Sequence, residues 1–272
     1  MARTTPSRPR DVERLFPELV PFRRPAVRLH PRSGTPTVRE SSVGGPLLWP
    51  REEPWPTCPD HLGTPMVPVL QLFAADALGL VPFPDGLDLL QLLWCPLDHD
   101  GCWVRPALFR RASGRVTEVR EPPPVPAGAA YGHVPAPCVV HPERVDEYPS
   151  WDLPESLWDA LEPRFDALEE DSGWSYEYHL ATAPGTKLGG YPGWCQDPDW
   201  PACPDCREPM EHLLTVESGE ADSLSGTIWT PYEDHGVRYS GPGLVLGDAG
   251  GVYFFECPTC PGRPGAHRYD CS

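Results

Sequence analysis

Four cysteines in the C-terminal part of the chain form two CxxC pairs. Cys203 and Cys206 lie in "CPDC", and Cys257 and Cys260 lie in "CPTC". A two-residue spacer lets both sulfurs reach one metal ion while backbone amides turn toward the thiolates. We therefore predict that the four cysteines hold a structural zinc ion, although 50 residues separate the pairs. Four reduced thiols in a core are the simpler alternative, and a redox role is weaker because no thioredoxin pattern accompanies the pairs.

An earlier stretch repeats this arrangement with histidines in place of two cysteines. Cys58 and His61 form C-x₂-H, and Cys95 and His99 form C-x₃-H, with Cys102 as an alternative to His99. Zinc accepts both thiolate and imidazole ligands, so a second site of Cys₂His₂ type is a consistent interpretation. The alternative is a diverged copy whose fold no longer needs a metal. Each site would have four protein ligands, so we expect the metal to stabilise the fold and not to catalyse.

Both candidate sites belong to a long internal repeat. The stretch "GGPLLWPREEPWPTCPDHLGTPM" (44–66) aligns with "GGYPGWCQDPDWPACPDCREPM" (189–210), and Trp49, Trp55 and Cys58 recur 145 positions later. Downstream, "DGLDLLQLLWCP" (85–96) corresponds to "DAGGVYFFECPTC" (248–260), and each apolar run predicts a buried strand that ends in Cys-Pro. Repeats of this kind indicate duplicated structural units. We expect an internal duplication of two pseudo-equivalent halves.

The elements that position these residues are short strands and few helices. Strands are predicted at 67–74 and 210–216, directly after the first ligand pair of each copy. A short helix is predicted at 11–19, and an amphipathic helix at 155–171, where Pro163 should bend or split it. The prediction is a β-rich α+β fold with a zinc-knuckle element in the second half. The expected divisions are an N-terminal helix and extension (1–40), a first repeat (41–120), a proline-rich linker (121–150) and a second repeat (151–272).

Composition limits the classes of function. Pro 39 and Gly 25 among 272 residues indicate many loops, while ten tryptophans argue for a packed core. The net charge of -17 argues against nucleic acid as a direct partner and permits a basic protein partner. The N-terminal segment has no apolar signal-peptide core and no run could span a membrane, so we expect a cytoplasmic protein with reduced thiols.

Signatures of catalysis are absent from the sequence. No G-x-S-x-G, Walker or dinucleotide-binding motif occurs, and the isolated cysteines and histidines are interpreted as packing residues. An enzyme with a site between the two halves remains an alternative, with Asp98, His99 or His235 as its candidate residues. A scaffold or immunity-type protein for a locally encoded partner is a third alternative.

The paired phrases also carry a family resemblance. "SSVGGPLLWPREEPWP", "PVLQLF" and "FPDGLDLLQLLWC" resemble the bacterial YwqG-like family, a domain of unknown function. The second copy, "KLGGYPGWCQDPDWPACPDCREPMEHLLTV" with "YFFECPTC", is similar to the opening of the eukaryotic programmed cell death 2 proteins. The resemblance covers about residues 41–110 and 186–260, and departs from the pattern where Thr215 replaces the glutamine that Gln71 retains.

The resemblance implies little about function by itself, because similarity of fold does not carry function over such a distance. The YwqG-like family has no established reaction, and the eukaryotic relatives are implied to be dedicated chaperones for a small-subunit ribosomal protein. Together with the acidic charge, this predicts a protein-binding module, chaperone-like for a basic client and stabilised by zinc.

Overall fold

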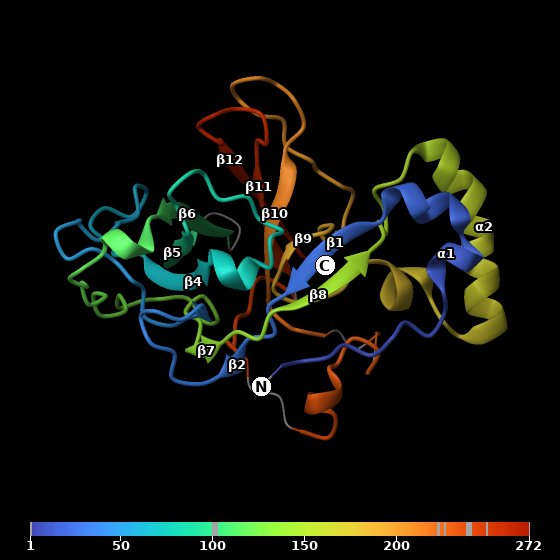
Figure 1. Cartoon of the computed structure of the whole chain (residues 1–272), viewed down its shortest axis with the longest axis horizontal. Coiled ribbons are helices and arrows are strands. Elements are labelled where there is room, and N and C mark those ends of the chain that lie inside the picture. The colour runs from blue at the N-terminus through green and yellow to red at the C-terminus, as the bar shows by residue number, and fades with distance from the viewer. Residues whose placement is uncertain are drawn as a thin grey trace.

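The chain folds into two six-stranded antiparallel sheets, with the two α-helices, α1 and α2, together at one side (Figure 1). The computed structural model describes residues 2–99, 103–221, 224–225, 227–237, 241–248 and 250–271. The architecture is the β-rich α+β fold that the sequence predicts. None of the described helices is long and apolar enough to cross a bilayer.

The two sheets have the following strands in spatial order. Sheet A contains β8 (Glu143–Glu147), β1 (Arg24–Arg28), β9 (Lys187–Gly189), β10 (Glu211–Glu217), β11 (Gly251–Glu256) and β12 (Gly265–Asp270). Sheet B contains β2 (Arg32–Ser33), β7 (Cys138–Val139), β3 (Ser42–Val43), β4 (Val67–Phe73), β5 (Leu89–His99) and β6 (Trp103–Arg111). The helical elements are α1 (Val12–Leu15), η1 (Pro17–Phe22), η2 (Ala74–Ala77), η3 (Ser113–Arg115), α2 (Glu155–Ser172), η4 (Glu177–Ala181) and η5 (Tyr232–Asp234).

Two extended segments each place one strand in either sheet. The N-terminal segment contributes β1 to sheet A and β2 to sheet B, whereas the stretch expected as a linker contributes β7 to sheet B and β8 to sheet A. In sheet A, β1 lies between β8 and β9, and in sheet B, β7 lies between β2 and β3. The two sheets have the same strand order when β7 of sheet B is matched with β1 of sheet A and every other strand of sheet B is matched with the strand numbered six higher.

The apolar runs of β5 and β11 are buried because each strand packs on both faces. Leu92 and Trp94 of β5, with Val252 and Phe254 of β11, point into one core that both sheets share. The alternate residues point away from that core into two aromatic clusters, one beneath each ligand-bearing loop. Side chains of a strand alternate between its two faces, so a strand between two apolar layers needs an unbroken apolar run.

The helical elements α1, η1, α2 and η4 form a separate, smaller core. Phe16 and Leu19, before β1, pack against Leu161 and Phe165 of α2. Of the two predicted effects of Pro163, a bend or a split, the split does not occur, since α2 is one helix over Glu155–Ser172. Leu161 and Phe165 are buried on either side of the exposed Pro163 and hold both halves of the helix on the same core.

Candidate metal centres

The four predicted cysteines of the second half come together in one cluster. Their sulfurs all lie within 4.8 Å of one another. The Sγ–Sγ distance is 3.8 Å between Cys203 and Cys260, and 3.6 Å between Cys206 and Cys257. A disulfide needs sulfurs about 2.05 Å apart, so these are free thiols in the arrangement of a metal site.

Local backbone hydrogen bonds build the loops that carry these cysteines. The Cys203 N–H donates to the Glu208 carbonyl (2.9 Å), and the Arg207 N–H donates to the Cys203 carbonyl (2.9 Å). After β11, the Cys260 N–H donates to Cys257 Sγ at 3.3 Å, and this bond lowers the pKa of the Cys257 thiol to about 7. An amide directed at sulfur stabilises the thiolate, which is the form that binds metal.

The candidate ligands of the first half form a second cluster of the same kind. The ligand atoms of Cys58, His61, Cys95 and His99 all lie within 4.8 Å of one another. His61 Nδ1 lies 3.4 Å from Cys95 Sγ and 4.0 Å from Cys58 Sγ, and His99 Nε2 lies 3.7 Å from Cys58 Sγ. Cys58 and Cys95 are buried, whereas both histidines are partly exposed. Cys102, the alternative to His99, lies outside the described residues.

A carboxylate stands behind one histidine of the first cluster. Asp60 Oδ2 lies 3.5 Å from His99 Nδ1 and 3.4 Å from Arg105 Nε. A carboxylate on the far nitrogen of a ligating imidazole fixes the tautomer that leaves the near nitrogen free to bind metal. The second cluster has only cysteine ligands, which have no tautomer to fix, so it does not need such a carboxylate.

Aromatic clusters fix the ligand loops on the sheets. In the first half, Trp49 packs on Trp55 (centroids 5.4 Å apart) and on Phe109 (4.9 Å). In the second half, Trp194 packs on Trp200 (6.4 Å) and Tyr253 (4.9 Å). In each half, the tryptophans thus pack the loop with the first ligand pair against the sheet. The second ligand pair lies at the end of a strand of that same sheet.

The first cluster borders a cavity of about 430 Å³. Its lining includes Asp98, His61 and His99 of the first half, and His267 of β12. Asp98 and His99, two of the three residues considered for an enzyme site, therefore both line this cavity. His235 lies beside η5, where its Nε2 is 3.0 Å from the Thr230 carbonyl oxygen.

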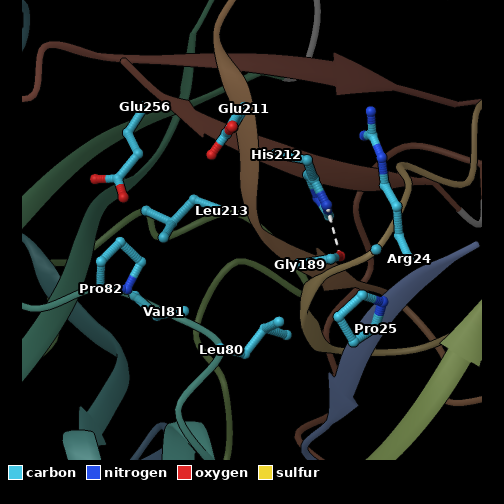
Figure 2. Close-up of a pocket in the computed structure, with 11 residues that line it drawn as sticks. Arg24, Pro25, Leu80, Val81, Pro82, Gly189, Glu211, His212, Leu213 and Glu256 are labelled. Carbon is cyan, nitrogen blue, oxygen red and sulfur yellow. Dashed lines mark hydrogen bonds between the residues drawn. The ribbon is translucent and has the colours of Figure 1, made fainter. Parts of the chain in front are cut away.

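A second cavity, of about 270 Å³, lies between residues 80–82 of the first half and strands β10 and β11 (Figure 2). His212 lines it, and its Nδ1 lies 2.8 Å from the Gly189 carbonyl while its Nε2 lies 2.9 Å from Thr215 Oγ1. Burial lowers the pKa of His212 to about 3, and Lys187 adds to that effect. A neutral ring with both nitrogens engaged serves as a structural group and is poorly placed as a base.

Sequence reasoning missed a buried charged network in sheet A. The Lys187 ammonium is fully buried and donates to Glu147 Oε1 (2.8 Å) and to the Ala183 carbonyl (2.8 Å). Close by, Glu217 accepts from the Gly185 N–H (2.6 Å), and burial raises its pKa to about 7. Lys187 is the only lysine in the chain, which is the one sequence signal that could have drawn attention to it.

Comparisons with known proteins give no family assignment. No protein-family model matches the chain, and no curated protein matches it. The two Cys/His clusters, which could each hold a metal ion, are therefore the firmest functional features.

Proposed function

We propose that the protein is a protein-binding module, chaperone-like for a basic protein client and stabilised by two structural zinc ions. The observation that carries the proposal is that each cluster offers four protein ligands to one point. A metal with four protein ligands has no open position for substrate, so it holds loops together. The net charge of -17 supports the choice of client, because an acidic protein favours a basic partner.

The geometry of both clusters supports zinc as the metal. Tetrahedral zinc with Zn–S bonds of about 2.3 Å and Zn–N bonds of about 2.0 Å places sulfurs about 3.8 Å apart, and sulfur and nitrogen about 3.5 Å apart. The sulfurs of the second cluster are separated by 3.6 and 3.8 Å. The sulfur–nitrogen distances of the first cluster are 3.4, 3.7 and 4.0 Å. We infer zinc-knuckle elements in both halves.

Matching irregularities support an internal duplication. A β-bulge falls between Pro68 and Leu70 in β4, and 144 positions later between His212 and Leu214 in β10. The isolated bridge between Thr57 and Pro65 recurs between Ala202 and Pro209. Bulges and single bridges are local irregularities, so their recurrence at matching positions argues for descent from one unit. The first copy of the repeated unit then contains strands β1–β6, and the second copy contains β7–β12.

The resemblance to the YwqG-like and programmed cell death 2 proteins supports the same role. It rests on the GG-x-x-x-W turns, the ligand pairs and the strands between them. Under this proposal the chain is a YwqG-like protein, and the chaperone role of the eukaryotic relatives extends to a basic client of this chain.

The test of this function has a metal arm and a client arm. Elemental analysis of the purified protein should give two zinc ions per chain. Equimolar protein should suppress the aggregation of purified small-subunit ribosomal proteins, which are basic, and should leave acidic proteins of similar size unaffected. Equal protection of both classes, or of neither, would reject the proposed client.

The cavity beside the first cluster favours an enzyme as the second candidate function. Asp98 and His99 line it, and residues from both halves contribute. An enzyme would need a metal position open to substrate, so the spectrum of the cobalt-substituted first centre should change with small anions such as azide or cyanide. An unchanged spectrum would favour the closed, structural centre.

A further inference from the structure

The cavity between the two halves has a counterpart elsewhere in the molecule that is filled. The strand order relates β1–β6 to β7–β12, so β10 and β11 correspond to β4 and β5. The loop "GLV" at 79–81 recurs at 243–245, with positive φ at Gly79 (76°) and Gly243 (68°). The cavity bounded by residues 80–82, β10 and β11 thus corresponds to the surface bounded by 244–246, β4 and β5.

In the first half, the chain itself covers that surface. The Val245 N–H donates to the Gly132 carbonyl (3.1 Å), and the Trp94 indole donates to the His133 carbonyl (2.6 Å). The Ala130 N–H donates to the Pro96 carbonyl (2.8 Å). Segment 129–136 is therefore a strap across the end of β5, tied to the opposite half through Val245.

The strap requires a glycine at its centre. Gly132 has φ +78°, and a Cβ built there would lie 2.4 Å from Val245 Cβ. A residue with a side chain would not fit so close to the loop at 243–245, and the positive φ of this position also favours glycine. The strap sequence around this position is "AAYGHVPA".

In the second half, the segment that corresponds to residues 129–136 is the one before β1, and it follows a different path. The residues that precede β1 form η1 (Pro17–Phe22), and Leu19 packs into the core of α1 and α2. Val81 corresponds to Val245, and within the described residues no group accepts a hydrogen bond from the Val81 N–H. The uncovered surface is the cavity of about 270 Å³ in Figure 2, where Leu80, Val81 and Pro82 form one wall.

Charge distinguishes the open cavity from its filled counterpart. Glu211 and Glu256 line the cavity at the positions of Val67 and Trp94 in the first half. Arg110 and Arg263 neutralise Glu256. Glu211 is exposed and forms no salt bridge with any described residue. Glu211 interacts with Arg263 only at longer range, and the other cation of the lining, Arg24, has its guanidinium over the rings of Tyr191 and Trp200. A carboxylate without a salt-bridge partner at the rim therefore favours a basic side chain in whatever occupies the cavity.

We propose that this cavity binds an extended segment of a partner protein that carries a glycine next to an arginine or lysine. The bound segment would lie as segment 129–136 lies in the first half, with a carbonyl accepting from the Val81 N–H and the basic side chain near Glu211. The chain's own strap is already engaged, so the occupant comes from another protein. This inference rests on the proposed function and names the recognition element of the basic client.

The test uses a fluorescein-labelled peptide with the sequence of residues 128–137, altered by Tyr131→Arg and His133→Arg. The zinc-loaded full chain should bind it, and amide exchange of Val81 should slow on binding. Replacing the peptide's central glycine with alanine should weaken binding by about tenfold or more, because a left-handed, crowded position rejects Cβ. Equal affinity for both peptides, or unchanged exchange at Val81, would overturn the proposal.

A matched pair of protein variants isolates the charge. Glu211→Lys should weaken peptide binding by about tenfold, whereas Glu170→Lys, the same charge change on exposed α2, should have little effect. If a basic client binds the wild type and Glu211→Lys equally, the cavity assignment is wrong while the proposed function stands. If the peptide binds as expected but basic clients are not protected from aggregation, the cavity assignment stands and the chaperone role is wrong.

Discussion

The two ligand clusters occupy equivalent places in the two halves and share one pattern of burial, but they differ in chemistry. The second cluster is all thiol, and the first has His61 and His99 in place of Cys206 and Cys260, at the same intermediate exposure. The first cluster borders an open cavity and has a supporting carboxylate. The comparison indicates that two sites can share one geometry with different ligands, provided that second-layer contacts orient those ligands.

The interiors of the two sheets differ in a parallel way. Sheet B buries a neutral amide pair, in which Gln91 Nε2 donates to Gln71 Oε1 (2.8 Å) and Gln71 Oε1 also accepts from the Leu48 N–H (2.7 Å). Sheet A buries charges, with Lys187 paired to Glu147 and with Glu217 nearby. The equivalent of Gln71 is Thr215, which is bonded to His212. One backbone plan thus tolerates either a neutral or a charged centre, as long as the polar groups are paired.

The largest expected difference between the halves is the cost of losing a metal centre. Cys203→Ser should remove one zinc and destabilise the protein by more than about 4 kcal/mol, the range of lost metal sites. Cys58→Ser should also remove one zinc but cost less, because Cys95 and His99 lie within strand β5, whose pairing with β4 and β6 holds it without the metal. Metal analysis with urea unfolding measures both. Equal costs would break the comparison.

The next effect is a pH dependence confined to sheet A. Because the pKa of Glu217 is raised to about 7 in the folded state, the folded protein holds a proton that the unfolded chain loses above about pH 4.5. Stability from this group is complete below pH 4.5 and falls by up to about 1.4 kcal/mol per pH unit until pH 7. Buried His212, whose pKa is lowered to about 3, makes stability rise with pH over the same window, so Glu217→Gln should make the free energy of unfolding rise more, or fall less, between pH 5 and pH 7 than in the wild type, as urea unfolding measures. Glu170→Gln, on exposed α2, is the control and should leave the slope intact.

A smaller effect distinguishes the carboxylates of the two ligand loops. Asp60 and Asp205 hold the same place in "CPDH" and "CPDC", but only Asp60 has a ligand histidine to orient. Asp60→Asn should weaken zinc binding at the first centre by about 10- to 100-fold, as lost outer-layer partners do. Asp205→Asn should leave the second centre unchanged. Competition with a chromogenic chelator measures both affinities, and a matching loss in the two variants would contradict the role of Asp60.

The smallest effect is expected from making the two centres alike. His61→Cys places a thiol where Cys206 stands in the second half, and zinc accepts either ligand. The variant should keep two zinc ions per chain and stay within about 1 kcal/mol of wild-type stability. Loss of one zinc would show that the first centre depends on imidazole at that position.

The sequence predicted the features that short, strong patterns encode. Both ligand sets follow from Cys and His spacing, and β4, β5, β10 and β11 follow from apolar runs that end beside those ligands. The exchange of β1 and β7 between the sheets could not be predicted, because β7 is two residues long in a proline-rich stretch. The buried network was also hidden, since Lys187 and Glu147 lie 40 positions apart and meet only through tertiary packing.

The exchanged strands have a consequence for synthesis on the ribosome. Sheet A receives β1 from a segment that precedes the other strands of both sheets, but sheet B receives β7 only when residues 138–139 have emerged. Residues 42–111 would therefore wait during translation with the edge of β3 unpaired, an exposed state that invites mispairing. Slowing elongation just before residue 138 should increase aggregation of the nascent chain, whereas a pause placed after β7 has emerged from the ribosome should not.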